Sequence, residues 1–374
     1  MILSDVCEFI VDCPHSTAPD EGKGYPLIRT PNVGKGRLDL NGVHRVSESV
    51  YKQRIQRGAP RANDLIFARE APAGNVALVQ ENQTVCLGQR TVLIRPNVQK
   101  VNPQYLVYYL LSPKPQYELL GTANGATVAH VNLPAIRNLK IELPEKSVQD
   151  KIGTILVTYD DLIENNQKQI KLLEEAAQRL YKEWFVDLRF PGHENTKIVD
   201  GVPEGWSRTN INEILTFHRG YDLTKNEMKA GRYPVVGSTT VIGYHNEFKI
   251  KGPGIVTGRS GSLGKYQFIW DNFWPHNTSL YISDYKDHNI FFVYSLLQTV
   301  DFASLNNGGA IPTLNRNVLS NIEVIEPTDE LQEMFAKIAE AQYRKIRNLE
   351  KQNNQLKMAR DVLLPKLMSG EVEV

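Results

Sequence analysis

The most constraining feature of this sequence is an internal repeat. Framework strings from the first half return in the same order in the second half: Leu3–Val6 is matched by Ile211–Ile214, and Tyr25–Ile28 by Tyr233–Val236. Further matched pairs are Leu65-Ile66 with Ile255-Val256, Arg69 with Arg259, Gly74 with Gly264, Val107-Tyr108 with Val293-Tyr294, Asn138–Ile141 with Asn321–Val324, and Leu180 with Leu363. Two diverged copies of one unit are therefore predicted, in the order globule, helix, globule, helix.

A long helix is predicted at the end of each copy, over residues 147–186 and about 329–364, with Pro365 and Gly370 ending the second. Apolar residues recur there at alternating steps of three and four, the spacing typical of coiled coils. The residues expected to form the two seams, and to dock subunits, are Ile152, Ile155, Tyr159, Leu162, Leu173 and Leu180, then Phe335, Ile338, Leu349, Leu356 and Leu363.

The two predicted helices are expected to pair with each other as an antiparallel coiled coil about 55 Å long. Because both lie in one chain, this pairing is favoured over dimerisation of two copies through the same stripes. Asp160 and Asp161 are expected on the solvated side of the first helix, and not as a catalytic pair of carboxylates. Polar residues expected to interrupt the seams and fix their register are Asn166, Gln169, Gln342, Lys345 and Gln352.

The globular parts are predicted to be α+β domains with curved sheets, giving an α+β chain with a pseudo-twofold repeat. Short strands broken by Gly, Pro and Asn support this, including 64–68 and 91–95 in the first copy and 255–257 and 279–283 in the second. The predicted boundaries are 1–145 for the first globular domain, 146–190 for the first helix, 191–325 for the second globular domain and 326–374 for the second helix.

Composition places the chain among soluble globular proteins, with 41% hydrophobic and 23% charged residues. No apolar run approaches the length of a membrane span, and Met1–Cys13 lacks the basic start of a signal peptide. Cys7, Cys13 and Cys86 show no paired spacing, so a disulfide framework or zinc site is not expected and a reducing cytoplasm is. The net charge of +1 is uninformative, although both globular parts are mildly basic.

One Gly-rich segment, Gly258–Lys265, looks like a phosphate loop but does not fit that pattern. Its glycine spacing is one residue too long, and Tyr266 stands where Ser or Thr would hold magnesium. A turn that presents Arg259 and Ser260 outward is favoured instead, matching the turn at 69–74 in the first copy. Arginine can read guanine edges in pairs of hydrogen bonds, and Asn or Gln can do the same with adenine. A structural turn with an exposed arginine is the open alternative.

Polar residues near predicted strand ends complete a set of candidate DNA contacts, because binding residues concentrate in loops. For any one of them, ordinary hydrogen bonding within the fold remains open. The set is Arg29, Arg69, Gln89, Arg90, His130, Arg219, Arg259, Ser260, Lys265, His276, Asn277 and Arg316. Motifs for amino-group methylation, for a nucleotide-driven motor and for a metal site are missing from the sequence, so no catalytic, metal or cofactor residue is predicted.

The chain resembles the specificity subunits of type I restriction–modification systems. The order of globules and helices carries the resemblance, together with fairly specific strings that span essentially the whole chain. These strings are Asp64–Gly74, Leu180–Phe185, Thr257–Gly264, Trp274–Thr278 and Gly309–Arg316.

The resemblance implies that each globule is a target recognition domain for one half of an asymmetric, two-part site in double-stranded DNA. It also implies that the helices set the spacing between half-sites and dock two modification subunits, which methylate adenine N6, and that restriction subunits with translocase activity join for host defence. S-adenosylmethionine, ATP and Mg²⁺ would be bound by those partners, and this chain would bind none of them directly. The open alternative is a coiled-coil scaffold for partners other than DNA. A standalone nuclease would need an acidic metal cluster that the sequence lacks.

Overall fold

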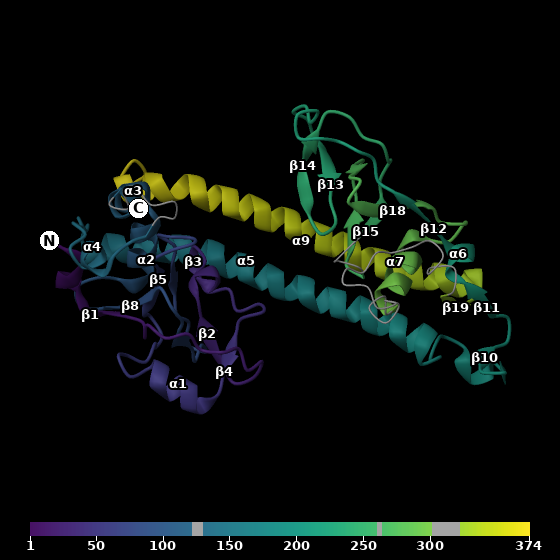
Figure 1. Cartoon of the computed structure of the whole chain (residues 1–374), viewed down its shortest axis with the longest axis horizontal. Helices are drawn as coiled ribbons and strands as arrows, with labels where there is room; N and C mark the ends of the chain where they lie inside the picture. Colours follow the sequence, from purple (N-terminus) through teal and green to yellow (C-terminus); the bar gives the residue numbers. More distant parts are fainter. Residues whose placement is uncertain (122–129, 260–263, 301–321) are drawn as a thin grey trace. The chain divides into compact units, whose positions relative to one another are not determined.

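The computed structural model describes residues 1–121, 130–259, 264–300 and 322–374 (Figure 1). Its contacts divide the chain into two units. Unit 1 comprises Met1–Gln167 and Glu350–Val374, and unit 2 comprises Lys168–Leu349. Both dividing points lie inside long helices, so each unit combines one globular part with a segment of each helix. The boundaries predicted for the four parts of the sequence stay a prediction.

Unit 1 contains a five-stranded sheet in the order β1-β8-β5-β6-β3 and a three-stranded sheet in the order β4-β2-β7. Its strands are β1 (Cys7–Asp12), β2 (Tyr25–Ile28), β3 (Gly36–Arg37), β4 (Arg45–Val46), β5 (Leu65–Ala68), β6 (Val76–Leu78), β7 (Cys86–Leu87) and β8 (Thr91–Pro96). Its shorter helices are η1 (Leu3–Val6), η2 (Thr30–Asn32), α1 (Glu48–Arg54), α2 (Pro103–Leu111), α3 (Pro113–Gly121) and α4 (Leu133–Arg137).

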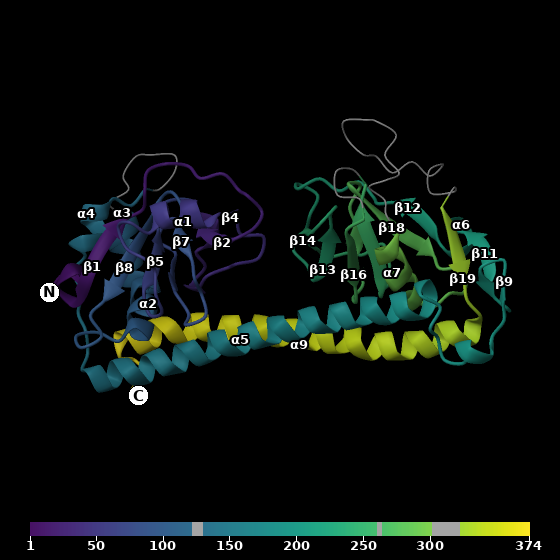
Figure 2. The same ribbon diagram turned by 90° about the horizontal axis from the view of Figure 1, so that it is seen from below.

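The central strands of unit 1 are buried on both faces. Because side chains alternate along a strand, Leu65 and Phe67 enter a core with α2 and the long helices, while Ile66 and Ala68 enter a second core on the opposite face. All four residues are fully buried. Figure 2 shows α2 between this sheet and the long helices of the unit.

Unit 2 contains a four-stranded sheet, β12-β18-β15-β16, a three-stranded sheet, β14-β13-β17, and two two-stranded pairs, β11-β19 and β10-β9. Its strands are β9 (Ile198–Val199), β10 (Val202–Pro203), β11 (Ser207–Asn210), β12 (Thr216–Arg219), β13 (Tyr233–Val236), β14 (Val241–His245), β15 (Gly254–Gly258), β16 (Tyr266–Ile269), β17 (Trp274–Pro275), β18 (Ser279–Asp284) and β19 (Glu323–Glu326). Its shorter helices are η4 (His193–Asn195), α6 (Ile211–Ile214) and α7 (Ile290–Thr299).

The core of unit 2 follows the same rule. Ile255 packs toward α7 and the long helices, and its neighbour Val256 packs on the opposite face of β15. Aromatic rings dominate the helix side: the ring centroids of Tyr181 and Phe335 are 5.6 Å apart, and Phe185 lies at a similar distance from Phe335. The two globular parts therefore share one plan, and the prediction of two strand-rich α+β domains is confirmed.

Matching backbone hydrogen bonds define equivalent positions in the two units, and they confirm the repeat. The amide of Leu3 donates to Leu139 O at 2.9 Å, as Ile211 does to Ile322 O at 3.0 Å. Three further pairs of backbone bonds, each from an amide to a carbonyl, match in the same way: Gly88 to Ile28 (2.8 Å) with His276 to Val236 (2.9 Å), Arg69 to Arg90 (2.9 Å) with Arg259 to Thr278 (3.2 Å), and Cys13 to Thr91 (3.1 Å) with Gly220 to Ser279 (3.0 Å). One pair of side-chain bonds also matches: Thr91 Oγ1 donates to Gly88 O and Ser279 Oγ donates to His276 O, both at 2.8 Å.

Two long helices complete the chain: α5 (Lys146–Tyr181), continued by one π-helical turn at Lys182–Val186, and α9 (Asp329–Ser369). The prediction that Pro365 ends the second helix is wrong. Pro365 lacks an amide donor and its ring crowds the carbonyl of Asp361, which destabilises a helix, yet α9 continues for four more residues, to Ser369. Gly370 ends it with a left-handed backbone (φ 76°).

Within each unit the segments of α5 and α9 are antiparallel, because contacts that advance along α5 step back along α9. In unit 1, Asp160 meets Arg360 and Asn166 meets Asn353. Supercoiling of the helices stays a prediction.

Several predicted seam residues are buried, but the predicted phase is partly wrong. Ile152, Phe335 and Leu349 are buried, whereas Leu162 is 46% exposed and Ile338 is 43% exposed. Their neighbours Ile163 and Ala339 occupy the seam instead. The remaining predicted residues are partly buried, namely Ile155, Tyr159, Leu173, Leu180, Leu356 and Leu363. Adjacent apolar residues left the sequence pattern with two possible phases, which explains the error.

The prediction that Asp160 is solvated is also wrong. Its side chain is 3% exposed, accepts a hydrogen bond from the Tyr108 hydroxyl at 2.6 Å, and pairs with the Arg360 guanidinium. Burial raises the pKa of the Tyr108 phenol, and the neighbouring Asp160 carboxylate raises it further. Asp161 is exposed, as predicted, and pairs with Arg37. These contacts attach α2 and the β3 region to both long helices inside unit 1.

Among the polar residues expected in the seam, Asn166 is buried and bonds with Asn353, its amide nitrogen lying 3.0 Å from Asn353 Oδ1. Asn353 was not predicted. Lys345 and Gln352 are exposed, so their placement in the seam is wrong for the same reason of phase.

Candidate nucleic-acid interface

In unit 1, four of the predicted contacts gather where strands end. β1 ends at Asp12, β5 ends just before Arg69, and the Gly88–Arg90 turn leads into β8. Because β1 and β5 are both paired antiparallel to β8, these ends lie at one edge of the sheet. They surround a hollow of about 270 Å³ that is lined by His15, Arg69, Glu70, Gln89, Arg90 and His130.

Arg69 is held by three partners. Its Nη1 donates to Asp12 Oδ2 at 2.9 Å, its Nε donates to Val131 O at 2.8 Å, and its Nη2 lies 2.9 Å from His130 Nε2. The side chain is only 12% exposed. Arg69 therefore shapes the wall of the hollow, and most of its hydrogen-bonding capacity is used within the protein.

Glu70 links the other two cationic side chains of the hollow. Its carboxylate lies 2.9 Å from Arg90 Nη1 and 2.5 Å from His130 Nδ1. Arg90 is mostly exposed, with the positive φ of 63° that its tight turn requires. Arg90 and the exposed amide of Gln89 are therefore the side chains most available to a ligand, and Glu70 orients Arg90.

Arg29 borders a second hollow, of about 150 Å³, whose lining also includes Gln89 and Arg90. Its Nε is buried and has no hydrogen-bond partner among the described residues. Arg54 forms the floor, where it donates to Pro14 O at 3.2 Å and to Ser16 O. All five candidates of unit 1 thus belong to one continuous polar surface.

In unit 2, the equivalent edge carries different side chains. Arg219 ends β12 and is exposed, with Nη2 3.5 Å from Asp222 Oδ1. Asn277 donates its amide to the same carboxylate. His276 Nε2 lies 3.2 Å from Leu223 O and its Nδ1 3.0 Å from Thr278 Oγ1. Asp222 therefore joins the two predicted contacts Arg219 and Asn277.

Arg259 follows β15 and is half-buried, and its amide donates to Thr278 O. Among the described residues, no carboxylate lies within ion-pair distance of its guanidinium. Lys265 is exposed, and its carbonyl accepts a bond from Thr257 Oγ1 at 3.0 Å. Ser260 and Arg316 lie outside the described residues.

Sequence reasoning missed the carboxylates Asp12, Glu70 and Asp222. Each sits directly at, or within three residues of, a strand end beside a predicted arginine, and that position was the available signal. Their presence changes the chemistry of the edge: a cation tied to a carboxylate presents a fixed set of donors to a ligand in place of a mobile charge.

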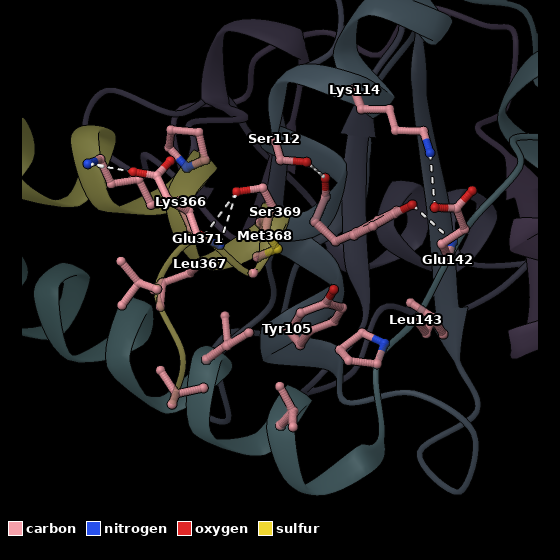
Figure 3. A pocket seen from close by; sticks show the side chains of 18 of the residues that line it. Tyr105, Ser112, Lys114, Glu142, Leu143, Lys366, Leu367, Met368, Ser369 and Glu371 are labelled. Atoms are coloured by element: carbon pink, nitrogen blue, oxygen red, sulfur yellow. Dashed lines mark hydrogen bonds and ion pairs between the residues drawn. The ribbon is translucent and has the colours of Figure 1, made fainter.

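Another hollow lies elsewhere in unit 1 and has a volume of about 1000 Å³ (Figure 3). Tyr105, Leu143 and the chain from Pro365 to Val374 line it, and two ion pairs flank it, Lys114–Glu142 at 3.1 Å and Lys366–Glu371 at 2.9 Å. Both cations are neutralised locally, so this hollow is a poor candidate for binding a polyanion.

The titratable thiols do not offer a nucleophile at neutral pH. Burial raises the pKa of Cys7 to about 12 and that of Cys86 to about 11, which keeps both protonated. In the described part of the chain, no group of His, Cys, Asp and Glu is arranged to hold a metal ion. No described helix combines the length and apolarity needed to cross a bilayer.

Comparison with known proteins places the geometry in a family context. The family described as "Type I restriction modification DNA specificity domain" matches residues 1–175 and 203–358. The chain is 27% identical over 364 residues to the type I restriction enzyme MjaIX specificity subunit of Methanocaldococcus jannaschii, covering 89% of this chain and 83% of that protein. The HindI specificity subunit of Haemophilus influenzae is 22% identical, with coverages of 84% and 87%.

A solved structure shows the same fold. The S subunit of a type I restriction–modification system from M. genitalium aligns with a TM-score of 0.62 at 18% identity, covering 98% of this chain and 95% of that chain.

Proposed function

Because the chain belongs to the family of type I restriction–modification DNA specificity proteins, we propose that it is the specificity subunit of such a complex. It reads an asymmetric, two-part site in double-stranded DNA, with one globular part for each half-site. It determines which DNA sequence is methylated or cleaved, and its partner subunits catalyse both reactions.

The observation that carries this proposal is a shared framework with different side chains at its strand ends. Arg69 and Arg259 occupy equivalent positions, but Asp12 of unit 1 is replaced by Arg219 in unit 2. The turn before β8 reads Gly88-Gln89-Arg90, and the equivalent turn before β18 reads His276-Asn277-Thr278. Since hydrogen-bonding side chains discriminate base edges, two different sets predict two different half-sites.

We assign two kinds of protein partner. Two modification subunits dock on the long helices and methylate adenine N6, and restriction subunits with translocase activity join them. Exposed apolar side chains on the helix segments support such docking, since large apolar side chains on a helix surface mark contact sites when they cluster. They are Leu162, Met358 and Val362 in unit 1 and Leu172, Met334 and Ile338 in unit 2.

We also assign the cofactors of the complex to the partners, with S-adenosylmethionine on the modification subunits and ATP and Mg²⁺ on the restriction subunits. The cytoplasm, where the DNA lies, is the compartment in which this complex would act.

Reconstitution tests the proposal. The purified chain alone is expected to methylate no DNA, and the chain mixed with its modification subunit is expected to methylate adenine in one two-part sequence. Sequencing that detects methylated adenine on a random DNA library reads the outcome. Methylation by the chain alone, or methylation by the mixture without sequence preference, would refute the proposal.

A further inference from the structure

The β13–β14 hairpin of unit 2 carries an exposed apolar surface on an edge strand. β14 is the outer member of the sheet β14-β13-β17 (Figure 1). Val241, Ile242 and Tyr244 are 41%, 48% and 58% exposed. The pairing register shifts at Ile242, because Val235 faces Gly243 and Val236 faces Val241. This bulge leaves two consecutive aliphatic side chains in solvent, an arrangement that edge strands ordinarily avoid.

In unit 1 the equivalent segment, the described residues 29–44 between β2 and β4, does not form such a hairpin. Its equivalent strand β4 has only two residues, Arg45 and Val46, which pair with Pro26 and Tyr25. The chain between β2 and β4 instead forms η2 and β3. In unit 2, a tight turn closed by Gly237 N to Thr240 O at 2.9 Å joins β13 directly to a longer β14. The exposed aliphatic pair is therefore an addition made in one copy only.

The turn of this hairpin touches the candidate DNA-contacting edge. Ser238 Oγ donates to Thr278 O at 2.7 Å, and Thr278 is the residue after Asn277. Gly237, in this turn, lies between Ile242 and Thr278: a Cβ atom added to it would be 2.8 Å from Ile242 Cγ2 and 3.8 Å from Thr278 Oγ1. Ile242 thus lies beside the turn that presents the Asn277 amide, so apolar and hydrogen-bonding groups form one surface.

Positively charged side chains lie in the segments that precede and follow the hairpin. Residues 225–251 include five exposed cationic side chains and two carboxylates, Glu227 and Glu247. Glu227 is occupied by Thr224, whose amide and hydroxyl donate to it at 2.9 and 2.7 Å. Among the described residues, none of the cations forms an ion pair. They are Lys225, Lys229, Arg232, Lys249 and Lys251. Arg232 lies over the Tyr233 ring and Lys249 over the Trp274 ring, but none of the five cations is neutralised by a described carboxylate, so they are complementary to DNA phosphates.

We propose that the β13–β14 hairpin enters the major groove of the half-site read by unit 2, where Val241 and Ile242 contact the 5-methyl group of a thymine. A two-stranded ribbon fits the major groove, and apolar side chains recognise that methyl group there. The lysines around the hairpin bind the flanking phosphates. This inference rests on the proposed function, because it names part of the specificity of that site.

Replacing thymine by deoxyuridine tests the contact directly, since it removes only the methyl group. The complex of the full chain with its modification subunit is presented with the cognate site, in which each thymine of the unit 2 half-site is replaced in turn. At the contacted thymine, the replacement should lower the methylation rate of the wild-type complex by about fourfold. The double variant V241S/I242S should methylate the two substrates at equal rates.

Two controls keep the test specific. The β9–β10 hairpin of the same unit also exposes two aliphatic residues, so I198S/V199S should leave the thymine–uracil difference unchanged. In V241S/I242S, the sensitivity of the other half-site to uracil should also persist.

Three results would overturn the inference: a thymine–uracil difference that survives in V241S/I242S, a unit 2 half-site without an A·T pair, or loss of modification-subunit binding by that variant in a pull-down, which would make the hairpin a protein-docking surface. If the wild-type complex shows no sequence preference at all, the proposed function itself fails, and that outcome is distinct from these three.

Discussion

The two units use the same backbone but differ in the charge pairing of their equivalent arginines. At the strand ends, unit 1 ties Arg69 to Asp12 and links Arg90 and His130 through Glu70. Unit 2 places Arg219 where unit 1 has Asp12, and its Arg259 has no ion pair among the described residues. Unit 1 therefore ties its central arginine, Arg69, to a carboxylate, whereas the equivalent Arg259 of unit 2 is freer to bind an anion and Arg219 at the same edge is paired with Asp222.

The helix segments repeat this contrast. The repeat aligns Asp160 with Tyr343 and Arg360 with Ala177. Unit 1 thus has a buried ion pair where unit 2 has an aromatic ring and a methyl group, both buried. The tyrosine that bonds Asp160 also has a counterpart: Tyr294 of unit 2 packs its ring against Tyr343, with centroids 5.2 Å apart.

The framework therefore does not depend on one kind of seam chemistry. A buried ion pair contributes little net stability, because desolvation offsets the attraction, yet removing one partner is costly. An apolar seam has neither property. The repeat therefore supplies an internal reference for each substitution, since the residue that unit 2 uses shows what the fold tolerates.

The largest effect is expected from Asp160→Ala. The change removes the buried partner of Arg360, which keeps only the exposed Asp361, and it leaves the buried Tyr108 hydroxyl without its acceptor. It should lower the free energy of unfolding by about 3 kcal/mol in urea titrations. Asp161→Ala, at the exposed neighbour, should cost at most about 1 kcal/mol. The double variant D160Y/R360A, which introduces the residue types that unit 2 has at these positions, should recover most of the loss. A loss for the double variant equal to that of Asp160→Ala would show that the unpaired charge of Arg360 is not the cause of the loss.

Arg69→Ala should separate the roles of the two equivalent arginines. It leaves the Asp12 carboxylate, which is largely buried, without its main partner, and should lower the free energy of unfolding by about 2 to 3 kcal/mol. The matched substitution Arg259→Ala should change the unfolding free energy by less than about 0.5 kcal/mol. Equal losses in urea titrations would contradict the contrast between the units.

The sequence predicted the framework because the signals for it are local. Matched strings such as Tyr25–Ile28 and Tyr233–Val236 encode strands and their hydrogen bonds directly. The helix phase was less certain, because neighbouring residues such as Leu162 and Ile163 are both apolar and either can face a partner. Alanine occurs on buried and exposed helix faces alike, so the sequence contains almost no indication that Ala339 is buried in the seam.

Long-range pairing explains what the sequence could not show at the site. Asp160 was expected in solvent because its partners, Tyr108 and Arg360, are 52 and 200 positions away. Arg69 was expected to be an exposed reader of DNA, yet Asp12 and Val131 hold it, 57 and 62 positions away. The polar residues at predicted strand ends indicated where the site lies. Which of them are free to contact DNA depends on partners that are distant in the sequence.

Arg259→Ala tests the freer arginine in its proposed role. If the side chain reads a base, the change should reduce the discrimination between correct and incorrect bases by about 1 to 3 kcal/mol. The reduction should affect only one of the two half-sites. Methylation rates of the reconstituted complex on a library of half-site variants give the measurement. A uniform loss across all sequences would make Arg259 a phosphate contact, and a loss confined to the other half-site would reverse the assignment of the units.

A smaller effect is expected at the pair Asn166–Asn353, for which the repeat again offers apolar counterparts, Leu349 and Ile170. Asn166→Leu should cost about 1 to 2 kcal/mol, because it leaves the buried Asn353 amide unpaired. The double variant N166L/N353I should be as stable as the wild type or more so, but it loses a polar pair that holds one register of the helices.

If register sets the distance between half-sites, the reconstituted double variant should methylate sites over a wider range of spacer lengths than the wild type. A spacer preference as narrow as that of the wild type would mean that the Asp160–Arg360 pair holds the register without help from the asparagines.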